Sequence, residues 1–320
     1  MGVLYITSQN DGVGKTTLTA ALVGILKDSG KKAIGLIPYR EGDLVDTERD
    51  ILSRLLGEEI GGPSYSSKDT LISAIVDAGA KSAFVIVEGP GTVDQADHID
   101  IVSKTEAKAI VVSDFTDGDS CLEFARNFGS DLAGVVINCR TKYGRTEMAN
   151  KVTPVFEEAG IPILGVIPED RTLLSLTVGQ ISENLGGNFF CGEHRSDRLV
   201  EHFMIGGFGM DPGQYVFSTR NKKAVVVRGD RPDVQMSALQ TDMECFIMTN
   251  GLEPIEYVKY ESDEEDVAVI IVETNTLETM DRLASLQKLA RFDHPEKLER
   301  AKTLVSENVC VETLADPEQI

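Results

Sequence analysis

The sequence has no long apolar segment, and this absence limits where the protein is expected to work. No window in the 320 residues approaches the length of a membrane span, and the N-terminus lacks the basic region, apolar stretch and cleavage site of a secretory signal. We therefore expect a cytoplasmic protein with no membrane partner. The length suffices for two domains, and a hydrophobic content of 42% suffices for a core in each.

Basic residues are also scarce. The chain has 31 Lys and Arg against 52 Asp and Glu, which gives a formal net charge of −21. A protein that grips a nucleic-acid backbone needs a basic face, so we expect no nucleic-acid partner. The simplest account of the acidic excess is solubility, as in the run 263–266, which looks like a solvated turn before an apolar strand.

Cysteine is infrequent and scattered. The five cysteines lie at positions 121, 139, 191, 245 and 310, with no C-x-x-C pair and no histidine at ligand spacing. We expect reduced structural thiols.

One short segment near the N-terminus carries most of the functional information. An apolar run, Val3–Ile6, leads through a glycine-containing loop into residues 18–26, whose apolar residues have helical spacing. The loop departs from the pattern G-x-x-x-x-G-K-[ST] at its first position, which is occupied by Gln9. The core that remains is Gly12, Val13, Gly14, Lys15, Thr16 and Thr17.

This core predicts a nucleoside-triphosphate site. Backbone N–H groups of such a loop and of the following helix cradle phosphate oxygens, while Lys15 reaches the terminal phosphates and Thr16 ligates magnesium. The alternative is a lysine-bearing glycine turn that binds nothing.

Short apolar runs alternate with helical patterns along the first half of the chain. The runs are Val3–Thr7, Ala33–Ile37, Ala83–Val87, Ala109–Val112, Gly134–Ile137 and Ile163–Val166. This alternation predicts an α/β fold with a doubly wound, mostly parallel sheet of the P-loop NTPase type. In such a sheet, ligands gather at the carboxyl ends of the strands.

A second, smaller α/β domain is expected after an irregular, glycine-rich stretch at 186–215. We place the first domain at 1–205 and the second at 206–320. The expected strands of the second are Ala224–Val227, Cys245–Thr249 and Val267–Val272, and its expected helices are Pro232–Leu239, Leu277–Leu289 and Glu296–Val305. Asp230 and Arg231 precede the first of these helices, where they either bind a ligand or, in the case of Asp230, cap the helix.

Two carboxylates follow strands of the first domain. Asp46 lies in a stretch, 43–50, that opens a helix towards Leu56, and Glu88 directly ends the third strand. A carboxylate at either place can hold a metal ion or its water. The alternative for Asp46 is a helix N-cap, and for Glu88 a structural partner within the fold.

These motifs carry a resemblance to a known family. The phosphate loop, the Asp46 helix and the stretch Val87–Gly91 resemble dethiobiotin synthetase and its relatives, including the cobyrinic acid a,c-diamide synthases. Residues 164–171 and 177–181 look closer still to the N-terminal region of long-form bacterial phosphotransacetylase, where a dethiobiotin-synthetase-like domain precedes a DRTGG domain. Residues 229–233 stand in place of the stretch that names that domain.

The resemblance implies roles for individual residues. Gly12 to Thr17 would bind the phosphates of ATP, with GTP remaining open, and Thr16, Asp46 and Glu88 would hold Mg²⁺. Asn138 would read the base, and Pro168 and Glu169 would border the base or ribose. A turn-forming role at the end of a strand is the alternative for Asn138.

The departures from the family shape the functional hypothesis. Dethiobiotin synthetase has a substrate-binding lysine where this chain has Ile37, and Arg40 offers charge in a different geometry. We expect that this chain is not an acetyltransferase by itself. We expect a Mg-ATP-binding regulatory or sensor protein that meets a small-molecule effector and forms a homo-oligomer through the second domain. The alternative is an ATP-dependent ligase, or a slow ATPase, in which Lys15 and Glu88 are catalytic.

Overall fold

The computed structural model describes residues 2–38, 52–57, 60–61, 67–91, 93–207 and 213–314. The chain divides into two compact units, Met1–Asp170 with Phe292–Ile320 and Arg171–Arg291, each of which has its own sheet. The predicted α/β class is confirmed for both. Within the described ranges, no helix is long and apolar enough to cross a membrane.

The first unit is built on a seven-stranded parallel sheet. Its spatial order is β3-β2-β4-β1-β5-β6-β7. The strands are β1 (Gly2–Thr7), β2 (Ala33–Leu36), β3 (Ile60–Gly61), β4 (Phe84–Glu88), β5 (Lys108–Asp114), β6 (Leu132–Arg140) and β7 (Ile163–Pro168). Because every pairing is parallel, all carboxyl ends lie at one edge, with β1 between β4 and β5.

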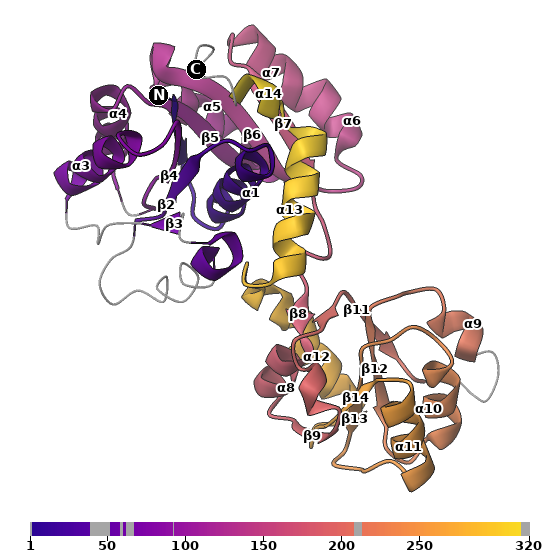
Figure 1. Cartoon of the computed structure of the whole chain (residues 1–320). Helices are drawn as coiled ribbons and strands as arrows, with labels where there is room; N and C mark the ends of the chain where they lie inside the picture. The colour runs from indigo at the N-terminus through magenta and orange to yellow at the C-terminus, as the bar shows by residue number, and fades with distance from the viewer. Residues whose placement is uncertain are drawn as a thin grey trace. The chain divides into compact units, whose positions relative to one another are not determined.

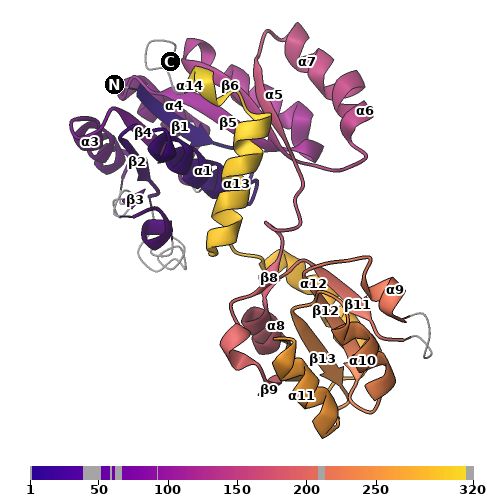
Figure 2. The same cartoon turned by 45° about the vertical axis from the view of Figure 1, so that its right-hand side comes forward.

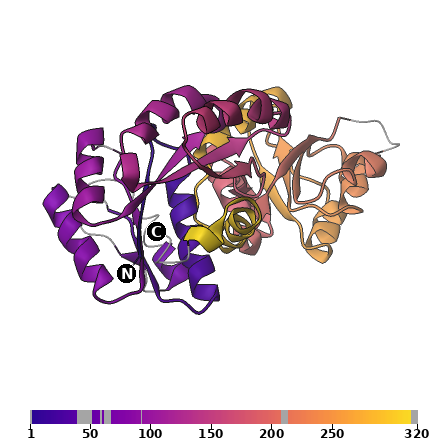
Figure 3. The same cartoon turned by 90° about the horizontal axis from the view of Figure 1, so that it is seen from above.

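Helices cover both faces of this sheet (Figure 3). One face carries α3 (Lys68–Gly79), α4 (Gln95–Lys104), α5 (Gly118–Arg126) and α7 (Thr153–Glu158), whose buried side chains share one hydrophobic core with the strands. The short α6 (Arg145–Glu147) and the π-helical turn η3 (Met148–Val152) lead into α7. The other face carries α1 (Lys15–Asp28) and α13 (Pro295–Asn308), which lie side by side in Figures 1 and 2.

The return of α13 to the first unit corrects the predicted domain boundary. Lys302 of α13 pairs with Asp28 of α1 at 2.5 Å, and Arg300 pairs with Asp170 at 2.8 Å. The apolar face of α13 is buried in the same unit. The second unit therefore runs from 171 to 291 rather than from 206 to 320. The sequence could not predict this boundary, because an amphipathic pattern indicates that a helix has an apolar face but not which core that face packs against.

The second unit contains a five-stranded sheet in the order β11-β12-β13-β14-β9, with β9 antiparallel. The strands are β9 (Asn188–Cys191), β11 (His202–Ile205), β12 (Lys223–Arg228), β13 (Cys245–Thr249) and β14 (Ala268–Ile271). Two further short strands, β8 (Leu176–Thr177) and β10 (Leu199–Val200), form an antiparallel pair. The expectation of irregular structure at 186–215 was wrong for the strands β9, β10 and β11.

Alternation along the strands divides the second unit into two cores. Ala224 and Val226 of β12 face one core, whereas Val225 and Val227 face the other, as the twofold period of a strand requires. The first core includes side chains of α8 (Val178–Leu185) and α12 (Thr276–Leu286), and the second those of α9 (Gly213–Phe217), α10 (Pro232–Leu239) and α11 (Glu256–Glu264). All five cysteines are free.

Candidate nucleotide-binding site

The loop between β1 and α1, residues 8–14, has the backbone of a phosphate loop. Gly12 and Gly14 have φ angles of 74° and 95°, a region that favours glycine. Gly14 is the N-cap of α1, no side chain caps the helix, and its first turn holds no acidic residue. The N–H groups of that turn are thus left for an anion, which they and the helix dipole favour.

Lys15, the first residue of α1, is held inside the loop. Its ammonium group donates to Ser8 Oγ at 2.8 Å and lies 3.5 Å from Asp11 Oδ1, and only 8% of the side chain is exposed. Ser8 Oγ in turn donates to the carbonyl oxygen of Asn10 at 2.6 Å. Asp11 is 72% exposed, so an entering phosphate can replace it as the partner of Lys15 at little cost.

Two of the three predicted magnesium ligands come together. Thr16 Oγ1 donates to Glu88 Oε1 at 2.9 Å, because β1 and β4 are paired with Ile6 opposite Glu88. A hydroxyl and a carboxylate side by side, next to the phosphate loop, form the kind of oxygen set that Mg²⁺ prefers, so the residues fit that ion. The third predicted ligand, Asp46, lies outside the described residues, as does Arg40.

Asn138, near the end of β6, contacts the phosphate loop directly. Its Nδ2 donates to the carbonyl oxygen of Val13 at 2.9 Å, and a Cβ atom placed on Gly14 would overlap that amide. Asn138 therefore supports the loop in this structure, and its predicted reading of the base stays a prediction.

Pro168 is the last residue of β7, the strand next to β6, and Glu169 follows it. Pro168 is in register with Arg140, and the backbone N–H of Glu169 donates to the Arg140 carbonyl at 3.0 Å. This places both residues at the same sheet edge as Asn138. The Glu169 side chain is exposed, as a residue that borders a ligand needs to be.

Sequence reasoning missed the residues that follow β5. Asn10 Nδ2 of the phosphate loop donates to Asp117 Oδ2 at 2.9 Å, where Asp117 is the N-cap of α5. The signal was present in the sequence, because the segment 114–117 follows an apolar strand just as Glu88 does. The rule that ligands meet the carboxyl ends of parallel strands applies to β5 as much as to β4.

A buried histidine also escaped the sequence analysis. Tyr5 Oη lies 2.8 Å from His98 Nδ1, and burial together with the charge of Lys15 lowers the pKa of His98 to about 4. The imidazole is therefore neutral near pH 7. A Cβ atom on Gly89 would lie about 3 Å from both rings, so this pair packs tightly under the residue next to Glu88.

In the second unit, the charges of the predicted ligand site are paired with their neighbours. Asp230 binds Arg228 through both oxygens, at 2.9 and 2.5 Å, and Arg231 binds Asp233 in the same way, at 2.9 and 2.8 Å. The N-cap of α10 is Arg231, so the alternative in which Asp230 caps this helix is wrong. A ligand role for Asp230 and Arg231 stays a prediction.

Comparison with known proteins agrees with the two units. A model of the CobQ/CobB/MinD/ParA nucleotide binding domain matches residues 4–178, and a model of the DRTGG domain matches residues 180–286. The predicted architecture of a dethiobiotin-synthetase-like domain followed by a DRTGG domain is confirmed.

Individual relatives are distant. The chain is 25% identical over 154 residues to the phosphate acetyltransferase of Nitratidesulfovibrio vulgaris, covering 45% of this chain and only 22% of the relative. It is 26% identical over 201 residues to the ATP-dependent dethiobiotin synthetase of Methanococcus vannielii, covering 53% and 94%. The solved septum site-determining protein MinD of Pyrococcus horikoshii, complexed with Mg-ADP, is 23% identical with a TM-score of 0.39, covering 54% and 83%.

Proposed function

This chain belongs to the CobQ/CobB/MinD/ParA nucleotide-binding domain family, and on that premise we propose that it is a Mg-ATP-binding regulatory protein. Nucleotide occupancy of the first unit would change how the DRTGG unit meets a small-molecule effector or a second copy of the chain. Lys15, Thr16 and Glu88 would serve binding rather than turnover.

The observation that carries the proposal is a cluster of residues suited to phosphate and metal binding, located near a strand end that is apolar. Lys15, Thr16 and Glu88 converge at the start of α1. At the end of β2, where the resembling synthetase has a substrate-binding lysine, Ile37 is only 4% exposed and packs in the core. A buried aliphatic side chain cannot attract a carboxylate or a carbamate, which argues against synthetase chemistry.

The bound groups would act as follows. Backbone N–H groups of residues 12–17 would hold the β- and γ-phosphates, and Lys15 would exchange Asp11 for a phosphate oxygen. Mg²⁺, held by Thr16, Glu88 and the predicted Asp46, would neutralise phosphate charge. Asn138 is hydrogen-bonded to the loop at Val13, so a change in the loop's conformation on nucleotide binding would be transmitted through it to the ends of β6 and β7.

An ATP-dependent ligase is the second candidate. The same cluster of Lys15, Thr16 and Glu88 favours it, because Lys15 beside a metal can stabilise a transferring phosphoryl group. The match that covers nearly all of a dethiobiotin synthetase also favours it. Such an enzyme would release ADP only when its acceptor is present.

The test is calorimetric titration of ATP, ADP and GTP, each with magnesium, into wild type, Lys15→Ala and Lys104→Ala. Lys104 is a matched control, because it lies on α4 and pairs with Asp100 at 3.0 Å. Loss of a charge-assisted contact of about 1.5–3 kcal/mol weakens binding by roughly tenfold to more than a hundredfold. We expect that loss for Lys15→Ala and unchanged binding for Lys104→Ala.

An ADP-release assay on the same samples, run without and with a panel of carboxylate and amine acceptors, separates the two candidates. Binding with little or no ADP release under either condition supports the regulatory protein. Steady release by wild type that disappears in Lys15→Ala would transfer the assignment to an enzyme, and absence of any nucleotide binding would refute both.

A further inference from the structure

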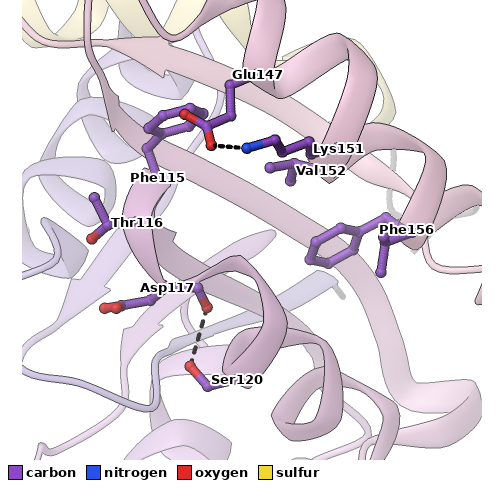
Figure 4. Close-up of a pocket in the computed structure, with 9 residues that line it drawn as sticks. Phe115, Thr116, Asp117, Ser120, Glu147, Lys151, Val152 and Phe156 are labelled. Carbon is purple, nitrogen blue, oxygen red and sulfur yellow. Dashed lines mark hydrogen bonds and ion pairs between the residues drawn. The ribbon is translucent and has the colours of Figure 1, made fainter.

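A pocket of about 520 Å³ lies beside the phosphate loop and shares no residue with the predicted nucleotide site. It opens between the segment that follows β5 and the helical segment 145–158 that follows β6 (Figure 4). This volume falls within the ordinary range of small-molecule sites. The nine lining residues are Phe115, Thr116, Asp117, Ser120, Glu147, Lys151, Val152, Val155 and Phe156.

One part of the pocket is apolar and firmly packed. Phe156 is 1% exposed and Phe115 is 9% exposed, and both belong to the hydrophobic core of the first unit. Gly144 packs against the Phe115 ring, where an added Cβ atom would come within 2.9 Å. Val155, 37% exposed, lines the pocket near the solvent. A ligand with an apolar body could thus bury that body against rings already fixed in place.

The polar part of the pocket carries a negative balance. Asp117 lines it, and the neighbouring Asp114 accepts hydrogen bonds from the backbone N–H and hydroxyl of Thr116 at 2.9 and 2.8 Å. Glu147 and Lys151 pair with each other at 3.1 Å, so their charges offset.

The N-terminus of α5 is the feature that would favour an anion here. It is equivalent to about half a positive charge, which is less than the two carboxylates of Asp114 and Asp117. The formal charge of −21 adds a field of the same sign as these carboxylates. The pocket therefore favours a cation.

We propose that this pocket binds a small organic ammonium ion with an apolar body. The ammonium group lies near Asp117, and the body lies on Phe115, Val152 and Phe156. Figure 4 shows Thr116 and Asp117 on one side of the pocket and Val152 and Phe156 on the other. This proposal does not depend on the proposed nucleotide-binding function.

The same aspartate ties the pocket to the phosphate loop. Asp117 Oδ2 accepts the hydrogen bond of Asn10 at 2.9 Å, and its second oxygen has lone pairs for a ligand. A bound ammonium ion would interact with the same Asp117 carboxylate that holds Asn10 in place. Binding in the pocket and binding in the nucleotide site are therefore linked. Such linkage acts equally in both directions.

The test uses three probes that share one shape and differ in charge: 3-phenylpropylammonium, 3-phenylpropanol and 3-phenylpropionate. Dissociation constants come from NMR titration of the full chain without nucleotide. We expect the ammonium probe to bind most tightly and the carboxylate most weakly. Asp117→Asn, which keeps an acceptor for Asn10, should weaken the ammonium probe two- to fivefold and leave the alcohol unchanged.

A second pair of variants locates the binding. Val155→Trp fills the pocket from its rim and should weaken the probe at least tenfold. Val76→Trp, at a 54% exposed position on α3, is the matched control and should have no effect. Equal affinity for the three probes, tighter binding of the carboxylate, no binding of any probe, or full binding by Val155→Trp would each overturn the proposal.

Repeating the titration with saturating Mg-ATP tests the link to the phosphate loop. We expect the affinity for the ammonium probe to change, and this change to disappear in Asn10→Ala. An unchanged affinity, in a protein that binds ATP, refutes the link. If ATP itself does not bind, the proposed function fails while the probe titration still decides the pocket.

Discussion

Gly14 offers the sharpest test of how the phosphate loop is built. Its φ of 95° costs an L-residue about 1–2 kcal/mol, and a Cβ atom there would also displace the amide of Asn138. Displacement breaks the 2.9 Å hydrogen bond from Asn138 to Val13, which contributes about 1 kcal/mol. We therefore expect Gly14→Ala to destabilise the first unit by roughly 2–3 kcal/mol.

Gly12 is the matched control. Its φ of 74° is also positive, but a Cβ atom there would meet nothing within 4 Å. Gly12→Ala should therefore cost only the backbone contribution, about 1–2 kcal/mol. The gain from restricting the unfolded chain is the same for both substitutions and cancels in the comparison.

A double-mutant cycle isolates the contact. In an Asn138→Ala background the obstacle is gone, so Gly14→Ala should cost no more than Gly12→Ala does. Because the chain has two units, stability is best read from native-state hydrogen exchange of peptides in β1 and α1 rather than from one global transition. Equal costs for Gly12→Ala and Gly14→Ala in the wild-type background would refute the reasoning, as would a cost for Gly14→Ala that Asn138→Ala leaves unchanged.

Two further predictions concern the first unit. The pKa of His98 is about 4, below the usual 6.5, so the unfolded chain binds more protons between these pH values and stability should fall by up to about 3 kcal/mol as pH drops from 6.5 to 4. In the variant His98→Phe, the stability of the first unit, read from native-state hydrogen exchange, should lose much of that pH dependence. An unchanged pH profile would contradict the lowered pKa of His98. Leu304→Ala, on α13, should lower the stability of the first unit by about 2–5 kcal/mol and so speed its hydrogen exchange. Leu286→Ala should have the same effect on the second unit, and the reverse pattern would refute the observed division of the chain.

The central strands of the first unit were readable from the sequence. Strands β1, β4, β5 and β6 are buried on both faces, so they appear as short, almost purely apolar runs between helical patterns. The helix α10 was predicted with the bounds observed, Pro232–Leu239, because proline marks its first turn. Local chemistry of this kind does not depend on distant residues.

The short strands and the domain boundary were not readable. β3 has two residues and β9 is an antiparallel strand next to glycines, so neither has enough length for a period to show. The place of α13 depended on a partner far away in the sequence, since α13 packs against α1.

The candidate site shows the same division. By itself, the sequence determined the phosphate loop, the lysine and threonine that follow it, and a carboxylate at the end of β4, because these are set by a contiguous motif and by strand order. Only the tertiary structure decided that Thr16 meets Glu88, that Asn138 supports Val13, and that Asn10 reaches Asp117. These contacts join residues 72 to 125 positions apart, and parallel pairing of the strands is the physical reason that their ends meet at one edge.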